Sequence, residues 1–397
     1  MGFLHFLPEL AKESSADSCL ATTLTAISYA SFAHQRHHSS LVARSRLSYG
    51  HALRAVNRAL QDPAEAIKDS TLTSILMLQM YEHIDSQDYH QHNSHEVGLR
   101  LLLQLRGEDQ FRTSRGHHLY RNVVGYLRQH DTRSSGPNKG PLPLDFDKLR
   151  ISSAHPAIRY HRLNNIKTTF LSQITSLLCL DPSGPIVQRD GLALLRASAD
   201  LDAQYASWFA NLPERWQPRL VSVSGSWKLA PTNGRVYTFA VPTPPCIMAS
   251  ARTHRAMMHK EVVALAVRLG VAEWTSETEI GKWSLSRCRE VVREQYEEIL
   301  STAAFTLGEL DDGVSAWYFS SSSSPDSDDS SPPVSILSLV SEKTPLRGRC
   351  VLAFYMMWPL LHVYKDGNGT SGQKADARRC LEYMGHVLGI RRCLAEI

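Results

Sequence analysis

The sequence has no cysteines in a C-x-x-C arrangement, no block of Lys or Arg, and no run of about 18 uninterrupted apolar residues. Its seven cysteines are odd in number and far apart, so we expect buried thiols in a reducing compartment and no disulfide framework or thiolate zinc site. We expect no membrane-spanning helix, because no apolar run is long enough. The 43 basic and 39 acidic residues are spread along the chain, which provides no basic arm for nucleic acid.

The local motifs of common enzymes are missing as well. There is no G-x-S-x-G elbow, no G-x-x-x-x-G-K-[ST] loop, no G-x-G-x-x-G turn and no H-E-x-x-H pair. Each of these would place a nucleophile, a phosphate cradle or a pair of zinc ligands in a defined local geometry. We therefore expect no catalytic residue, no cofactor and no resident metal.

What the sequence does contain is the composition of a globular protein with helical patterning. The 397 residues are 43% hydrophobic and 21% charged, which is enough to bury a broad core. Within residues 41–60, Tyr49, Leu53, Val56 and Leu60 recur at the spacing of one helix face. This pattern predicts an amphipathic helix that packs one side against a core.

Two further segments are apolar nearly all round. Residues 72–84 and 97–105 are predicted to be helices buried on every side, because neither has a polar face. Gly107 follows the second segment, where a residue in the left-handed conformation commonly ends a helix.

The later part of the chain has the same helical character. One predicted helix face is formed by Val292, Tyr296, Ile299 and Ala303. Residues 349–364 form an apolar helix in which Pro359 predicts a kink or a helix end. Few segments alternate like a half-buried strand, and residues 235–240 are the best short candidate. The predicted fold class is therefore α: an all-helical, multi-helix domain with long Ser/Pro/Gly-rich loops and at most a minor β-hairpin.

Breaks in the helical pattern predict the organisation of the chain. A Gly- and Pro-rich stretch at residues 131–147 is predicted to be a flexible loop between an N-terminal helical half, residues 1–130, and a C-terminal half, residues 148–397. Within the second half, residues near 311–345 include a run of Ser, Asp and Pro that predicts a disordered insert, because little there can be buried to offset the entropy of ordering.

A His-rich stretch at residues 82–96 is the strongest candidate for metal chemistry. It holds imidazole and carboxylate groups, the ligands of zinc or iron sites: Glu82, His83, Asp85, Asp88, His90, His92, His95 and Glu96. Turn-like residues in this stretch favour a polar connection between two helices, with His95 held for packing or capping. A helical biosynthetic-pathway enzyme with a metal site in 82–96 remains an alternative.

Several motifs give the sequence a resemblance to a known family. Residues 49–66, followed by Asp69-Ser-Thr-Leu72, resemble the opening of the fungal-specific transcription factor domain, the regulatory region of zinc-cluster transcription factors. His95-Glu-Val-Gly98 and the following Leu105-Arg-Gly107 resemble its H-x-x-G and L-x-x-R-G elements. Residues 208–216 are similar to its W-x-x-x-L-P-x-x-W element.

Further matches follow in the family's order along the chain. They lie at residues 301–308, where Ala303 and Ala304 replace the usual proline, at 358–360 and at 389–390. The residues that carry the resemblance are His95, Gly98, Arg106, Gly107, Trp208, Pro213, Trp216, Leu307, Gly308, Trp358, Pro359, Leu360 and Gly389. We expect structural roles for all of them: glycines where helices cross or end, tryptophans in the core and prolines at bends.

The resemblance implies a nuclear transcription regulator, often of a fungal secondary-metabolite gene cluster, that does not act by catalysis. Family members normally begin with a six-cysteine binuclear zinc cluster, which this sequence lacks. We therefore expect this chain to contact DNA only indirectly, or through an N-terminal zinc cluster that is missing from this sequence. The expected partner is another protein, either a DNA-bound transcription factor or a second copy, with a small-molecule effector possible. A co-activator or scaffold of a DNA-binding regulator is the alternative within this class.

Overall fold

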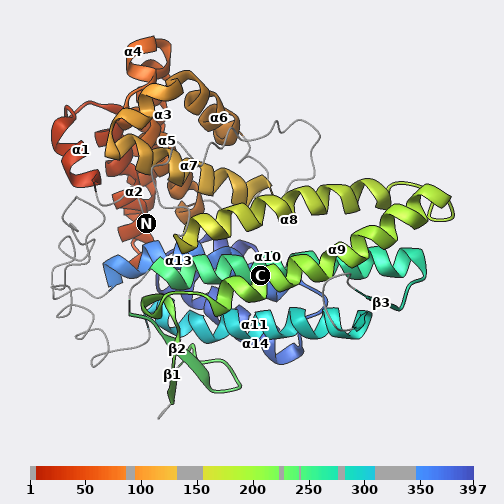
Figure 1. The fold of residues 1–397 in the computed structure, drawn as a ribbon. Helices are drawn as coiled ribbons and strands as arrows, with labels where there is room; N and C mark the ends of the chain where they lie inside the picture. The colour runs from red at the N-terminus through yellow and green to blue at the C-terminus, as the bar shows by residue number, and fades with distance from the viewer. Residues whose placement is uncertain are drawn as a thin grey trace. The chain divides into compact units, whose positions relative to one another are not determined.

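The computed structural model describes residues 6–85, 94–131, 155–222, 228–240, 243–275, 282–308 and 346–397. Most of these residues are α-helical, and the strands among them form two short antiparallel pairs, as Figure 1 shows. The predicted all-helical fold class is confirmed. None of the described helices is long and apolar enough to cross a membrane.

The chain divides into two compact units, each built from separate stretches of sequence. Unit 1 comprises residues 1–151, 325–350 and 382–397, and unit 2 comprises residues 152–324 and 351–381. The predicted loop at 131–147, except for its first residue, and the predicted insert at 311–345 lie outside the described residues.

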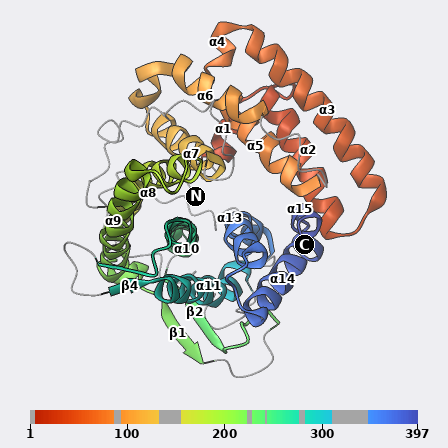
Figure 2. The ribbon, with the colours of Figure 1, turned by 90° about the vertical axis from the view of Figure 1, so that its right-hand side faces the viewer.

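Unit 1 is a group of helices around one central helix. Its elements are α1 Leu7–Glu13, α2 Cys19–Gln35, α3 Ser39–Gln61, α4 Pro63–Ala66, α5 Asp69–Asp85, α6 Ser94–Arg106, the 3-10 helix η1 Gly107–Arg112, α7 Ser114–Asp131 and α15 Arg392–Ala395. Helix α2 begins where the Ser18 hydroxyl accepts a hydrogen bond from the Ala21 amide, a regular N-cap. Figure 2 shows α3, α2 and α5 packed side by side.

Helix α5 is the buried centre of unit 1. Its apolar residues have no exposed side, and Leu72 and Leu78 are completely buried. It contacts α1, α2, α3, α4, α6, α7 and α15. The prediction of a helix buried on every side at residues 72–84 is confirmed. Helix α3 also confirms the amphipathic helix predicted for residues 41–60, with Val56 buried and Leu60 exposed at its end.

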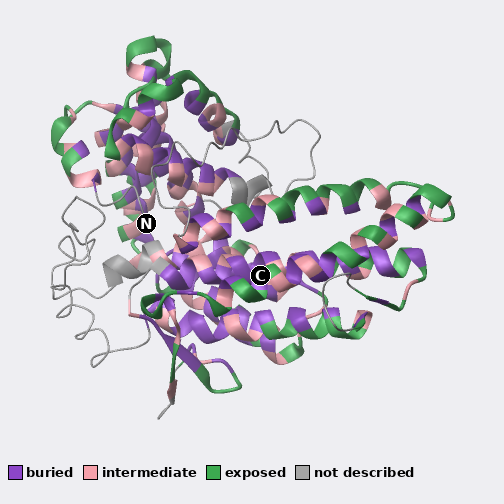
Figure 3. Ribbon diagram, in the orientation of Figure 1, coloured by how far each residue is buried: buried purple, intermediate pink, exposed green. Residues whose placement is uncertain are grey.

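Helix α6 differs from its prediction. It forms where expected, but only one face is buried, with Leu99, Leu102 and Leu103 inside. The opposite face exposes Val97, Leu101 and Leu105 by 59%, 53% and 68%; Figure 3 shows buried and exposed residues alternating along this helix. Helix α6 packs against α5, η1 and α7, so neighbours cover one side. The predicted left-handed residue is confirmed at Gly107, whose φ is 52°.

Unit 2 is built on four long helices with two small hairpins. Its elements are α8 Pro156–Leu178, α9 Pro185–Ala210, the 3-10 helix η3 Glu214–Trp216, β1 Arg219–Ser222, β2 Arg235–Thr238, α10 Thr243–Leu269, β3 Glu273–Thr275, β4 Lys282–Ser284 and α11 Leu285–Leu307. Helices α13 Leu346–Lys365 and α14 Ser371–His386 each cross the boundary between the units. Strand β2 pairs with β1, which confirms the strand predicted at residues 235–240.

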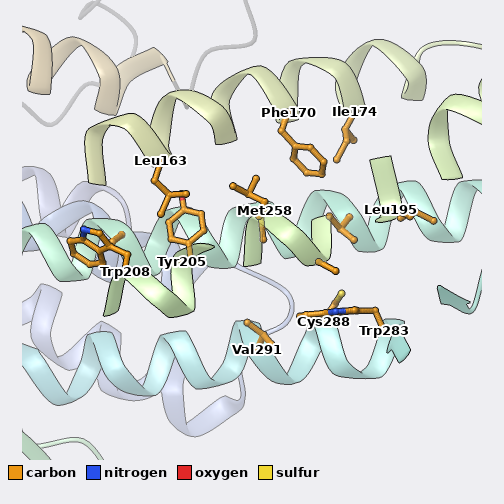
Figure 4. Close-up of a cluster of buried hydrophobic side chains, with 14 of the residues drawn as sticks. Leu163, Phe170, Ile174, Leu195, Tyr205, Trp208, Met258, Trp283, Cys288 and Val291 are labelled. Carbon is orange, nitrogen blue, oxygen red and sulfur yellow. The ribbon is translucent and has the colours of Figure 1, made fainter. Parts of the chain in front are cut away.

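The core of unit 2 lies between α8, α9, α10 and α11. Figure 4 shows Leu163 and Phe170 of α8 beside Tyr205 of α9 and Met258 of α10. Helix α11 carries the predicted apolar face, and all four of its residues are buried: Val292, Tyr296, Ile299 and Ala303. The burial of these helix faces provides the hydrophobic stabilisation of this unit.

Helix α13 does not end at Pro359. It continues to Lys365 with the proline inside it, so of the two predicted outcomes the helix end is not observed. An internal proline costs about 3 kcal/mol because it removes a hydrogen bond and crowds the preceding turn. The turn after it is deeply buried, with Leu360 and Val363 fully inaccessible to solvent. Burying two such side chains contributes about 3–6 kcal/mol, which offsets the proline.

Candidate functional site

A polar network in unit 1 is centred on the carboxylate of Asp85, the last residue of α5. His34 Nε2 of α2 donates to Asp85 Oδ1 over 2.9 Å, and Arg46 Nε of α3 donates to Oδ2 over 3.1 Å. The Tyr81 hydroxyl donates to Oδ2 over 3.3 Å. Burial raises the pKa of Asp85, but the hydrogen bonds from His34 and Arg46 outweigh it, so the pKa is lowered overall. The carboxylate therefore links three helices.

One turn earlier on α5, Glu82 makes a second set of links. It accepts hydrogen bonds from the Tyr49 hydroxyl of α3 at 2.8 Å and from His95 Nε2 of α6 at 2.7 Å. The Tyr49 ring stacks on Tyr81 with centroids 4.3 Å apart. Burial, followed by the nearby Glu82 charge, raises the pKa of Tyr49, so this phenol stays protonated and donates. Glu82 thus joins α3, α5 and α6.

These contacts show that residues at both ends of the His-rich stretch 82–96 form hydrogen bonds between packed helices. Glu82, Asp85 and His95 hold neighbouring helices, and Glu96 is buried. His83 is fully buried in α5. Residues 86–93, which contain Asp88, His90 and His92, lie outside the described residues. Among the residues that are described, no group of three or more His, Cys, Asp or Glu side chains is arranged to hold a metal ion.

Unit 2 contains a second buried ionic group, the Asp202 cluster, formed by Asp202 of α9 with Arg255 and His259 of α10. Arg255 donates to both carboxylate oxygens at 2.6 and 2.8 Å, and His259 Nε2 donates at 2.6 Å. His259 stacks on Trp283. Burial raises the pKa of Asp202, but hydrogen bonds from His259 and Arg255 hold it well below its usual range. The cluster is a charged cross-link between two core helices.

Sequence reasoning missed the Asp202 cluster. Arg255 and His259 are four residues apart and share a helix face, a spacing that the sequence does show. Asp202 is 53 residues from Arg255, so no local pattern joins it to them. A similar group was also missed, in which Glu298 of α11 accepts from Arg252 at 2.6 Å and Tyr237 at 2.9 Å.

The motif residues at the end of α6 cap a helix start. The Arg106 guanidinium donates to the Ile67 carbonyl and to Asp69 Oδ1, each over 2.6 Å. Because these groups lie at the N-terminal end of α5, Arg106 ties α6 to the beginning of the central helix. Gly107 ends α6 in the left-handed region. Gly98, by contrast, has open space where a Cβ would lie, so the expected close helix crossing is not present there.

The later motif residues also lie in packing positions within unit 2. Trp208 is buried and its Nε1 donates to the Pro156 carbonyl over 2.9 Å. Pro213 precedes η3, which contains the buried Trp216. Leu307 is buried, Gly308 ends α11 with φ of 82°, and in α13 Pro359 and Leu360 are buried beside the half-buried Trp358.

Gly389 is the motif glycine with the strongest steric requirement. Its φ is 75°, and a Cβ would lie 3.0 Å from His34 Cβ and 3.1 Å from the Gln35 amide nitrogen. Both contacts belong to the end of α2, the helix that places His34 against Asp85. A side chain at this position would be strained by its own backbone and crowded by a neighbouring one.

Replacing Gly389 with alanine is therefore expected to lower the free energy of unfolding of unit 1 by about 2 kcal/mol. Gly98→Ala is the matched control, because Gly98 lies inside a helix with open space around it; it is expected to raise stability by about 0.5–1 kcal/mol. Hydrogen–deuterium exchange of peptides from α2 and α5 would measure both changes. Equal effects of the two substitutions would contradict the steric role of Gly389.

Comparison with family models matches residues 2–136 to the fungal specific transcription factor domain. The match contains the unit 1 networks and the motif residues His95, Gly98, Arg106 and Gly107; the resemblances from Trp208 onward lie beyond it and stay a prediction. Comparisons with curated proteins and with solved structures gave no match. Residues 2–136 of this chain, which include the described helices organised around α5, are therefore similar to the fungal specific transcription factor domain.

Proposed function

We propose that this chain is a nuclear transcription regulator that acts through its helical domain by contacting a partner protein, and not by catalysis. A role in transcription regulation is supported by the family match over residues 2–136. The match is the observation that carries the proposal. The contacts of Glu82, Asp85 and Asp202 agree with it, because each carboxylate accepts hydrogen bonds from side chains of other helices.

The proposal extends to the target and to the route to DNA. The regulated genes are those of a fungal secondary-metabolite cluster, in keeping with the family resemblance. DNA is reached through a DNA-bound partner or through an N-terminal zinc cluster on a longer product. The helical halves at residues 1–130 and 148–397 then serve as one regulatory region, with residues 131–147 as the connection between them.

A tethered reporter assay tests this function. The 397-residue chain is fused to an unrelated DNA-binding module, and transcription of a reporter carrying its site is compared with that of the module alone. We expect the fusion to change reporter transcription several-fold in either direction. Deletion of the gene, followed by transcript sequencing, is expected to alter a set of neighbouring biosynthetic genes. If neither the reporter nor any transcript responds, the chain is not a transcription regulator.

A further inference from the structure

The helical hairpin formed by α2 and α3 has an unusual charge distribution. From Ser18 to Gln61 the sequence contains no aspartate or glutamate. The same stretch contains five arginines, which are Arg36, Arg44, Arg46, Arg54 and Arg58. The two helices pack against each other over their length, so the hairpin presents positive charge without a carboxylate of its own.

The hairpin has a hollow with a largely apolar lining. The hollow has a volume of about 540 Å³ and is lined by Leu24, Thr25, Ser28, Tyr29, Phe32 and Leu41. Thr25, Ser28, Tyr29 and Phe32 follow the spacing of one face of α2, and Leu41 contributes from α3. Phe32 is 50% exposed. An exposed aromatic ring beside a hollow is a common feature of protein-binding surfaces.

Two of the arginines lie over rings that line the hollow. The Arg44 guanidinium is 5.0 Å from the centroid of the Tyr29 ring, and that of Arg36 is 6.0 Å from the centroid of Phe32. Both arginines are exposed, and neither forms an ion pair with a carboxylate among the described residues. Arg46 differs, because Asp85 neutralises it at 3.1 Å. The hollow therefore has two uncompensated positive charges at its edge.

We propose that this hollow binds an acidic amphipathic segment of a partner protein, with apolar side chains in the hollow and carboxylates on Arg36 and Arg44. A guanidinium binds a carboxylate through paired N–H groups, and a helix with apolar residues on one face fits a groove of this kind. A nucleic acid would use the charges but leave the Leu24 and Leu41 lining unmatched. This inference rests on the proposed function, for which it identifies the partner-binding surface.

Fluorescence anisotropy with a labelled peptide tests the inference on the full chain. The probe is a synthetic peptide of about 18 residues, with leucine and phenylalanine on one helical face and glutamate on the other. We expect a Kd in the range of about 1–100 µM at about 50 mM salt, weakening as salt is raised because exposed charges are screened. A peptide of the same composition in scrambled order, and one with glutamine in place of glutamate, are expected to bind at least about fivefold more weakly.

Matched variants of the hairpin separate this surface from general positive charge. The double variant Arg36→Glu/Arg44→Glu is expected to weaken binding at least about tenfold, because repulsion replaces two attractive contacts. The control Arg54→Glu/Arg58→Glu changes the net charge of the protein by the same amount, but both positions lie on α3 more than three turns from Leu41. Because they are far from the hollow, this control is expected to weaken binding by about twofold or less. Phe32→Ser removes the exposed ring and is expected to weaken binding about fivefold. Circular dichroism verifies that each variant is folded.

Three outcomes would overturn the proposal. The first is that the peptide does not bind at about 200 µM protein and low salt. The second is that the two charge-reversal variants lose the same amount of peptide affinity. The third is that a duplex DNA binds through Arg36 and Arg44 more tightly than the peptide does, which would make the hairpin a nucleic-acid surface. The reporter assay tests the proposed function independently of this surface. If the peptide binds but the fusion has no effect on transcription, the binding surface stands and the proposed function is wrong. If the fusion changes transcription but the peptide does not bind, only the binding surface is wrong.

Discussion

The Asp202→Asn variant is expected to lose about 3–5 kcal/mol of unit 2 stability, because it leaves the partly buried Arg255 guanidinium and the buried His259 ring without their carboxylate. Arg255 and His259 both donate to Asp202 at 2.6–2.8 Å, and His259 is fully buried. Asparagine retains the shape and one acceptor oxygen but removes the negative charge. Urea denaturation followed by tryptophan fluorescence measures the effect on this unit, since all seven tryptophans of the chain lie in unit 2.

Asp190→Asn is the matched control on the same helix. Asp190 lies near the start of α9 and pairs with Arg189, with both side chains largely exposed to solvent. An exposed pair contributes about 0–1 kcal/mol, because water competes for both charges. We therefore expect this substitution to leave the urea midpoint nearly unchanged. Equal destabilisation by the two substitutions would show that the Asp202 cluster has no special role.

The same cluster predicts a dependence on pH. The pKa of Asp202 is lowered in the folded protein, so its contribution to stability is fully present above the unfolded-state pKa of about 3.9 and is lost as pH falls through the folded-state value. The stability difference between the native chain and Asp202→Asn is then about 1 kcal/mol smaller at about pH 3 than at pH 7. A difference that is constant or larger at the lower pH would contradict this sign.

Leu99→Ala is expected to destabilise unit 1 by about 2–5 kcal/mol, the range for truncating a buried leucine and leaving a cavity. Leu99 lies on the buried face of α6 and is fully inaccessible to solvent. The same substitution at Leu101, two residues later and 53% exposed, is expected to change stability by about 0.5 kcal/mol or less. Both variants make the same chemical change in one helix.

Hydrogen–deuterium exchange of peptides from α5 and α7 is the appropriate measurement for this pair, because unit 1 contains no tryptophan. Leu99→Ala should accelerate exchange in both neighbouring helices, whereas Leu101→Ala should leave it close to the native rate. If both substitutions destabilise equally, α6 is buried on both faces, as its sequence pattern alone predicts.

The contrast between α5 and α6 shows how far apolar patterning can predict packing. Both segments are apolar nearly all round, yet α5 is covered on all sides while α6 is covered on one. Periodicity identifies the residues suited to burial, but the number of neighbouring helices determines which of them are buried. The same reasoning explains Pro359, where a local rule favours a helix end and the burial of the following turn outweighs it.

The polar contacts were less accessible to sequence reasoning than the helices were. The sequence identifies Glu82 and His95 as candidate metal ligands, whereas in the structure His95 donates a hydrogen bond to Glu82 and so links α6 to α5. No sequence pattern identifies Asp202, because its partners Arg255 and His259 are more than fifty residues away along the chain. Contacts of this kind depend on how helices approach one another, and no local spacing encodes that approach.

By itself, the sequence determined the helical fold class, the amphipathic helix α3, the burial of α5, the apolar face of α11, the left-handed end of α6 at Gly107 and, through its motifs, the similarity of residues 2–136 to the fungal specific transcription factor domain. These features depend on residue types at short spacings, where backbone and side-chain periodicity act directly. Only the tertiary structure decided which face of α6 is buried, which side chains donate to Asp85 and Asp202, and where Arg36 and Arg44 meet an apolar hollow. Those features arise from helix packing across long stretches of sequence, where burial and charge pairing override local preference.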